Sequence, residues 1–280
     1  MNAAAVLLAL ASAATWGVAD FSGGLLSRRV ATISVTVISQ SAGFVALLVA
    51  FGIHGGGLNG RSFWIGILSG LCGGAGLAAF YKALSIGTMS IVSPLSACGA
   101  LVPFGISVAT GERPGTIPLA GAALALGGAV LASAAEGRSE APDRVRAIAL
   151  ALLAAVTLGL FIYFLGLGSR EGSPLSTLLG ARVGSLSLLG ALALGRRQSL
   201  LIGRGLLLKV AAIGLCDVAA NVLFALASGR GLLALVSVLG ALYPVMTVLL
   251  AYVVLGERLT PLQIAGVGAA LVGVAALSSG

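Results

Sequence analysis

The stretch LGALYPVMTVLLAYVVLGERLTPLQIAGVGAALVGVAAL, residues 239–277, decides the fold class. Residues 231–256 and 259–280 on either side of its Glu257-Arg258 pair contain no Asp, Glu, Lys or Arg. Because a helix rises 1.5 Å per residue, about 20 apolar residues cross a hydrocarbon core about 30 Å thick. The stretch therefore predicts two membrane-spanning helices joined by a short Gly-Glu-Arg turn.

The composition of the whole chain agrees with a membrane protein. The 280 residues are 59% hydrophobic and 9% charged, whereas soluble domains carry about 25% charged residues. So few polar side chains cannot cover a water-soluble globule, which excludes a soluble enzyme, a disordered protein and a fibrous protein. We attribute the net charge of +8 to topology and to contact with anionic lipid headgroups, and expect no nucleic-acid partner.

Charged residues are rare enough to mark the loops between spans. The ten spans expected on this basis are 3–24, 32–53, 63–84, 89–109, 115–134, 147–167, 173–195, 205–228, 232–255 and 260–278. The longest polar stretch, EGRSEAPDRVR at 136–146, is interpreted as a linker between two halves, 1–135 and 147–280. We therefore expect an all-α polytopic membrane protein of ten transmembrane helices.

The two halves carry matching residues at a nearly constant offset of 142 to 145 positions. The matches are Gly111-Glu112-Arg113 with residues 256–258, Ala13 with Ala155, Thr15 with Thr157, Gly17 with Gly159, Gly87 with Gly231, Val92 with Val236, Ser93 with Ser237, Gly121 with Gly266 and Gly128 with Gly273. Five helices in each half make the second repeat enter the membrane in the opposite orientation. Such inverted repeats enclose a substrate site that opens alternately to each side, so the pattern favours transport.

The most specific sequence features resemble a known family. Residues 239–277 look like the end of an EamA-type repeat of the drug/metabolite transporter (DMT) superfamily, and YKALSIGTMSIVSPLSACGALVPFGISVATGERPGTIPLAGAALALGGAVL, residues 81–131, is similar to the same pattern. The resemblance implies ten helices in two inverted five-helix bundles, and movement of small metabolites, usually export, without ATP. The chain departs from a strict repeat because Gln40 stands opposite Arg182.

Polar side chains inside membrane spans are costly and therefore indicate function. The candidates are Asp20, Gln40, Lys82, Arg182, Asp217 and Asn221. In one interpretation Lys82, Asp217 and Asn221 bind a zwitterion, and Asp20 or Asp217 couples transport to protons. In the alternative, Lys82 extends to the headgroups, Arg182 forms a structural pair with Asp217, and Asn221 joins helices.

Aromatic residues make up 5% of the chain, so their positions are informative. Trp16, Phe80, Tyr81, Tyr163 and Tyr243 fall within spans that should line a central cavity if the family layout holds. A cavity of this kind would suit amino acids and similar solutes. The alternative is an interfacial belt or ordinary packing.

Prolines and glycines suggest where helices bend or pack. Pro94, Pro103 and Pro244 lie inside two spans and are candidate hinges, with static kinks as the alternative. Gly66, Gly70 and Gly74 have the spacing of close helix contacts. Gly121 with Gly128, and Gly266 with Gly273, predict that the fifth and tenth spans pack together. We expect the Gly-Glu-Arg turns to form loop ion pairs or to cap carbonyl groups at helix ends.

The loops offer no sign of an enzyme, metal or cofactor. They contain no Walker-type phosphate loop, HExxH, GxSxG or paired-carboxylate motif, the three cysteines are isolated, and His54 is the single histidine. Energy is therefore expected to come from an ion, exchange or substrate gradient. Orientation stays open: loop arginines favour termini outside the cytoplasm, whereas the family's usual description places both termini inside.

These features together predict a secondary transporter of the bacterial inner membrane. It is expected to export small organic metabolites, with amino acids, aromatic or otherwise apolar ones included, as the first candidates. A sugar-phosphate or nucleotide-sugar exchanger ranks lower because few cations lie within the spans. A drug efflux pump of the same fold and, further behind, a lipid flippase or lipid-modifying enzyme remain alternatives.

Overall fold

The computed structural model describes residues 2–27, 29–54, 57–86, 92, 95–96, 98–133, 144–198, 200, 202–255 and 260–278. All regular secondary structure within these residues is helical. The elements are α1 (Ala3–Ser27), α2 (Thr32–His54), α3 (Gly60–Ile86), a 3₁₀ turn η1 (Cys98–Ala100), α5 (Leu101–Ala109), α6 (Thr116–Ser133), α7 (Arg144–Glu171), α8 (Pro174–Gly195), α9 (Arg204–Ser228), α10 (Leu233–Gly240), α11 (Tyr243–Leu255) and α12 (Pro261–Ser278).

Seven stretches of the described residues are helical, long and apolar enough to cross a membrane, and three shorter apolar helices accompany them. The shorter helices are Cys98–Ala109, Thr116–Leu131 and Pro261–Ala276. The predicted spans therefore agree with the helices in position, although the ten-span count stays a prediction. Large apolar side chains such as Ile53 and Val253 are 79% and 73% exposed, as expected for surfaces that face lipid rather than water.

The ninth predicted span is not one continuous helix. α10 ends at Gly240, Ala241 and Leu242 form a turn, and α11 begins at Tyr243. Pro244 has no N–H and cannot donate to the Gly240 carbonyl four residues earlier, which explains why the helix cannot continue through this point. Proline is instead tolerated in the first turn of the new helix.

The fourth predicted span, 89–109, is also irregular where it is described. Val92, Leu95 and Ser96 are helical, the 3₁₀ turn η1 follows, and α5 covers Leu101–Ala109. Pro103 lies in the first turn of α5 rather than mid-helix, and Pro94 lies outside the described residues. The predicted linker 136–146 overlaps the start of α7 at Arg144. Its residues 136–143, and the second Gly-Glu-Arg turn at 256–258, lie outside the described residues.

Glycines bring α3 against α8, as the spacing of Gly66, Gly70 and Gly74 predicts. A Cβ on Gly70 would lie 1.9 Å from the Ala181 carbonyl oxygen, and one on Gly66 would lie 2.1 Å from the Thr177 carbonyl oxygen. The approach is looser at Gly74, where the nearest atom is Ser185 Cα at 3.2 Å. Only a residue without a side chain permits this backbone approach.

A reciprocal contact joins α2 and α9. A Cβ on Gly214 would lie 1.9 Å from the Ser39 carbonyl oxygen, the same distance as for Gly70 and Ala181. Gly214 follows Gly70 by 144 positions, and Ala181 follows Ser39 by 142. The packing of α2 on α9 thus repeats the packing of α8 on α3.

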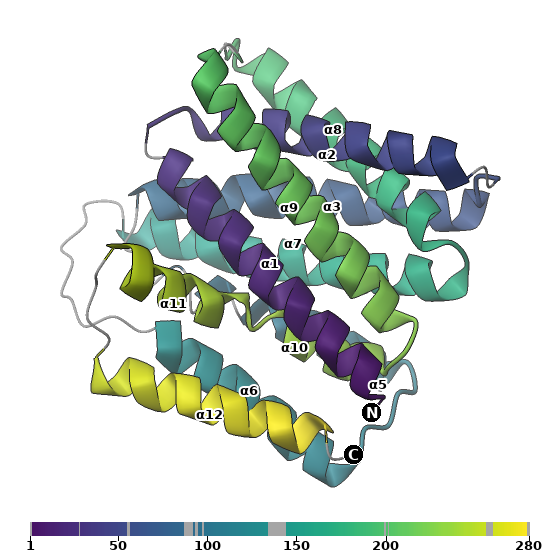
Figure 1. Cartoon of the computed structure of the whole chain (residues 1–280), viewed down its shortest axis with the longest axis vertical. Helices are drawn as coiled ribbons and strands as arrows, with labels where there is room; N and C mark the ends of the chain where they lie inside the picture. The colour runs from purple at the N-terminus through teal and green to yellow at the C-terminus, as the bar shows by residue number, and fades with distance from the viewer. Residues whose placement is uncertain are drawn as a thin grey trace.

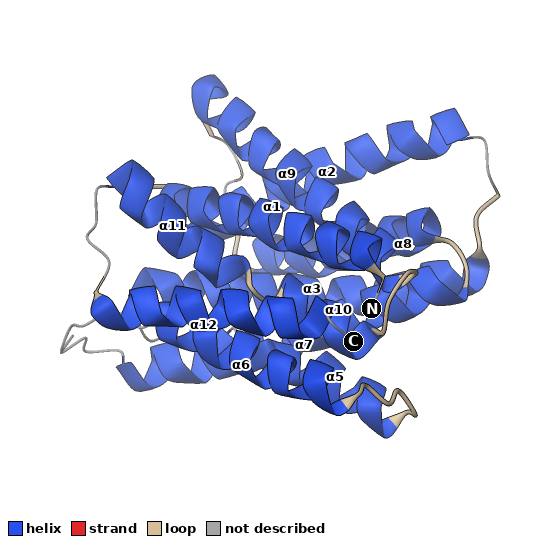
Figure 2. Cartoon of the chain, turned by 60° about the horizontal axis from the view of Figure 1, so that its bottom comes forward, coloured by secondary structure: helices blue, strands red, loops and turns tan. Residues whose placement is uncertain are grey.

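α6 and α12 pair at one edge of the molecule, side by side in both views (Figures 1 and 2). A Cβ on Gly128 would meet Ala270 N at 2.3 Å, and one on Gly273 would meet Ala125 N at 2.4 Å. The glycines predicted to pair the fifth and tenth spans therefore do so. The two termini lie close together beside this pair (Figure 1).

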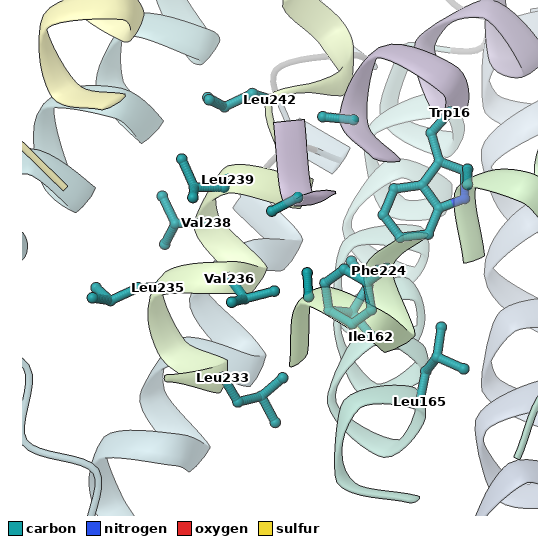
Figure 3. Packing of buried hydrophobic residues seen from close by; sticks show 14 of the residues in the cluster. Trp16, Ile162, Leu165, Phe224, Leu233, Leu235, Val236, Val238, Leu239 and Leu242 are labelled. Atoms are coloured by element: carbon teal, nitrogen blue, oxygen red, sulfur yellow. The ribbon is translucent and has the colours of Figure 1, made fainter. Parts of the chain in front are cut away.

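The larger of the two buried apolar clusters among the described residues extends across both halves of the chain and includes residues of α1, α7, α9 and α10. The Trp16 ring packs against Phe224 with centroids 5.6 Å apart, and the completely buried Val236 and Leu239 of α10 belong to the same cluster (Figure 3). This packing holds the end of α10, and therefore the break before α11, next to α1.

Candidate functional site

A polar cluster lies among α2, α8 and α9, well inside the apolar helices. The Arg182 guanidinium donates from Nη2 to Asp217 Oδ2 at 2.6 Å and from Nη1 to Gln40 Oε1. Ser185 Oγ donates to the same Gln40 oxygen at 3.0 Å. The Arg182 side chain is 6% exposed and that of Asp217 is 27% exposed. The Arg182–Asp217 pairing predicted from the sequence is therefore confirmed, with Gln40 as a third partner.

Asn221 extends this cluster by one helical turn of α9. Its Nδ2 donates to the Asp217 backbone oxygen at 2.7 Å and to Asp217 Oδ2 at 3.2 Å. These two acceptors fix the amide orientation, since the opposite orientation would set oxygen against oxygen. Asn221 Oδ1 is consequently left without a hydrogen-bond donor from the described part of the chain, although Asn221 is only 2% exposed.

A second carboxylate, Asp20 of α1, faces the same space. The Tyr81 hydroxyl of α3 donates a hydrogen bond to it, and Asp20 and Asp217 are near enough to interact electrostatically. Tyr243, the first residue of α11, hydrogen-bonds with Ser96. Polar groups from α1, α2, α3, α8, α9, α11 and the segment that contains Ser96 therefore converge on one region.

These groups border a cavity lined from both halves of the chain. Its lining residues are Trp16, Asp20, Gln40, Gly70, Gly73, Leu77, Phe80, Ser96, Gly99, Ala100, Leu158, Gly159, Phe161, Ile162, Leu178, Ala181, Arg182, Ser185, Asp217, Asn221, Ala241 and Tyr243. The helix interruptions in the fourth and ninth predicted spans both supply lining residues. Gly99 and Ala100 belong to η1, and Ala241 lies between α10 and α11. The small residues leave room, while the aromatic rings form apolar walls.

The structure brings most of the predicted site residues to this cavity and leaves three outside its lining. The predicted residues that line it are Trp16, Asp20, Gln40, Phe80, Arg182, Asp217, Asn221 and Tyr243. Tyr81 is buried behind Asp20, while Lys82 is exposed and Tyr163 is half-buried elsewhere. Asp217 and Asn221 line the cavity and Lys82 does not, so a zwitterion site made by all three stays a prediction.

Sequence reasoning missed several lining residues. Ser185 and Ser96 carry polar contacts, and Gly70, Gly99 and Ala241 shape the space. Serine, glycine and alanine are common throughout the spans, so residue type does not distinguish these positions. The prolines that interrupt the fourth and ninth spans were the sequence feature that pointed toward this region. Among the described residues no group of His, Cys, Asp or Glu could hold a metal ion.

A second group of polar contacts lies where α5 and α7 end and α10 begins. Glu112, in the turn after α5, forms an ion pair with Arg170 of α7 and accepts from Leu233 N at 2.9 Å and Ala234 N at 2.8 Å. We call these four residues the Glu112 clamp. The carboxylate caps the positive N-terminus of α10, so the predicted loop ion pair is confirmed for the first Gly-Glu-Arg turn.

Comparison with known proteins matches both halves of the chain separately. The sequence model of the EamA-like transporter family matches residues 3–134 and again residues 145–279. The chain belongs to the EamA-like transporter family. This family is part of the DMT superfamily, so the chain is a multi-pass membrane protein of a transporter family.

The EamA-type chain is also similar to solved structures. One, described only as "Crystal structure of protein", aligns over 99% of this chain and 96% of its own with a TM-score of 0.78 and 20% identity. At that identity the likeness shows a shared fold. No curated protein matches the chain significantly.

Proposed function

We propose that this protein is a secondary transporter that moves small organic metabolites across the bacterial inner membrane by alternating access. The observation that carries the proposal is the cavity itself: it is lined from both halves of the chain at the point where two spans lose regular helix. Interrupted helices at a site between repeats are a recurring feature of secondary transporters. Export is the direction we propose.

Reciprocal packing supports two inverted five-helix repeats, residues 1–135 and 147–280. A Cβ on Gly17 would lie 2.7 Å from the Tyr243 carbonyl oxygen, and one on Gly159 would lie 2.3 Å from the Gly99 carbonyl oxygen. Gly159 follows Gly17 by 142 positions and Tyr243 follows Gly99 by 144. A contact and its exchanged counterpart are what an approximate two-fold axis produces.

Amino acids with apolar or aromatic side chains are the first candidate substrates. Trp16, Phe80 and Tyr243 offer aromatic surface, and Asp20 and Asp217 offer acceptors for an amine. A sugar-phosphate or nucleotide-sugar exchanger ranks lower because Arg182 is the one cation among the described lining residues and is already paired. Efflux of cationic drugs is the alternative that the acidic residues favour.

Asp20 is the residue we propose for proton coupling. It lines the cavity, and Tyr81 donates to it, whereas Asp217 is held by Arg182. A carboxylate inside a span that contacts the cavity can exchange a proton between the two states. If Asp20 couples protons, the Asp20→Asn variant will still exchange substrate in the absence of a pH gradient. An imposed pH gradient will no longer accelerate substrate transport by this variant.

Counterflow into proteoliposomes tests the function. Vesicles preloaded with unlabelled phenylalanine, leucine and other amino acids are mixed with the labelled compounds, and saturable entry is measured. Accessibility of Leu158→Cys, in a background without Cys72, Cys98 and Cys216, is measured with a membrane-impermeant thiol reagent from each side. Saturable counterflow and labelling from both sides are expected. Folded, inserted protein that moves neither amino acids, amines nor phosphorylated sugars would overturn the proposal.

A further inference from the structure

We propose that the cavity recognises the protonated amine of its substrate through acceptors on α9 and α1, and that it does not bind a carboxylate. The inference rests on the proposed function and narrows its substrate class to organic ammonium compounds with an apolar body. Amino acids would then be recognised through their amine. Derivatives in which the carboxyl group is uncharged, such as amides, would bind at least as well as the amino acids themselves.

The first argument is the unpartnered acceptor on α9. Asn221 lines the cavity and is 2% exposed, and its buried Oδ1 receives no donor from the described residues. A buried acceptor without a donor destabilises the site, because it has lost its hydrogen bonds to water and gained none in the protein. A ligand N–H that reached this oxygen would remove that cost, so the site favours a hydrogen-bond donor.

The second argument is the balance of charge around the space. Asp20 and Asp217 face the cavity with Arg182 as the one cation among its described lining residues. Arg182 offsets the charge of Asp217, so the lining carries an excess negative charge whenever Asp20 is ionised. An ammonium ion compensates that excess, whereas an anion increases it.

The third argument is that Arg182 is already occupied. Its two terminal nitrogens donate to Gln40 and Asp217, and its side chain is 6% exposed. These contacts use two of its five N–H groups, and Asp217 already offsets its positive charge, so an added carboxylate or phosphate would gain less from Arg182 than from an unpaired guanidinium. Lys82 is exposed and outside the lining, so it does not replace Arg182.

The walls of the cavity are complementary to the apolar body of an organic ammonium compound. Trp16, Phe80 and Tyr243 present aromatic surface beside the acidic residues, and Leu158 and Ile162 add aliphatic surface. Aromatic faces attract cations as well as apolar groups. An arylalkyl amine combines both features.

A matched series of ligands tests the inference. Equilibrium binding of radiolabelled phenethylamine to the purified protein in detergent is competed with phenylalaninamide, phenylalanine and 3-phenylpropanoate, which share the ring and differ in their charges. We expect the amide to compete at least as well as phenylalanine, and the acid to compete at least tenfold less well than either amine. No binding of phenethylamine, equal competition by the acid, or a tenfold preference for phenylalanine over the amide would each overturn the inference.

Variants on α9 locate the binding group. Asn221→Ala is expected to weaken phenethylamine binding about tenfold, the effect of losing one hydrogen bond to a charged group. Ser228→Ala is the control, because Ser228 is equally buried seven residues further along the same helix, outside the cavity lining. Asn221→Asp keeps an acceptor and should retain amine binding. Unchanged affinity in a folded Asn221→Ala protein contradicts the assignment.

Binding in detergent and transport in vesicles separate the two proposals. Amine binding without counterflow of any compound would contradict the transport function while supporting the recognition site. Counterflow that selects phenylalanine and 3-phenylpropanoate over phenethylamine would support transport and overturn the amine site.

Discussion

Arg182 donates a hydrogen bond to Gln40, and the two residues occupy equivalent positions 142 residues apart. The same offset relates Gly17 to Gly159, so the pair joins α2 and α8 at corresponding points of the two halves. An arginine facing its own equivalent would meet a like charge, whereas glutamine offers an oxygen acceptor. The departure from a strict repeat at Gln40 therefore lets Arg182 stay inside the membrane with partners from both halves.

Removing the Arg182 guanidinium alone should lower the stability of the protein more than removing the guanidinium and the Asp217 charge together. Arg182→Met leaves a carboxylate without its cation, which costs about 3 kcal/mol at a fully buried site and less here because Asp217 is partly exposed. The double variant Arg182→Met/Asp217→Asn should recover part of the loss. Thermal unfolding in detergent measures both; strictly additive effects would show that the pair is not coupled.

The Glu112 clamp should matter more than the other ion pair on the same face. Glu112 is 14% exposed and also caps two amides of α10, so Glu112→Ala should lose about 1–2 kcal/mol. The matched control is Glu171→Ala, whose partner Arg61 is 76% exposed and whose loss should cost less than about 0.5 kcal/mol. Equal melting temperatures of the two variants would contradict a capping role.

Gly70→Ala should disrupt the contact between α3 and α8. The new Cβ would lie 1.9 Å from a backbone oxygen, so the helices must separate, at a cost of at least about 1–3 kcal/mol. Gly52→Ala is the control, because no atom lies within 4 Å of a Cβ there. Monodispersity and melting temperature after purification should fall for Gly70→Ala only. A stable, active Gly70→Ala protein would mean that this close approach is not required.

Lys82→Ala should leave the apparent KM for the transported solute within twofold of wild type. Lys82 is exposed and outside the cavity lining, whereas Trp16 lines the cavity. Trp16→Ala should raise the apparent KM severalfold through loss of aromatic contact. Counterflow measures the apparent KM of both variants. A tenfold increase for Lys82→Ala would show that Lys82 takes part in substrate binding.

The spans, the glycine contacts and the family could be predicted from the sequence. Hydropathy is summed over neighbouring residues, and the absence of charge from 231–256 needs no knowledge of the fold. The spacing of Gly66, Gly70 and Gly74 likewise defines one face of a helix. The pairing of Arg182 with Asp217 could be anticipated because an intramembrane charge requires a partner.

Apart from the Arg182–Asp217 pair, only the tertiary structure decided which of these side chains meet. Whether Lys82 or Asn221 reaches the cavity depends on the rotation of α3 and α9 about their axes, and apolar residues on every side of these helices leave that rotation undetermined by sequence. The donor for Gln40 comes from 142 positions away, and the amides capped by Glu112 come from 121 and 122 positions away. Contacts over such separations follow from helix packing, which the local pattern of residues does not specify.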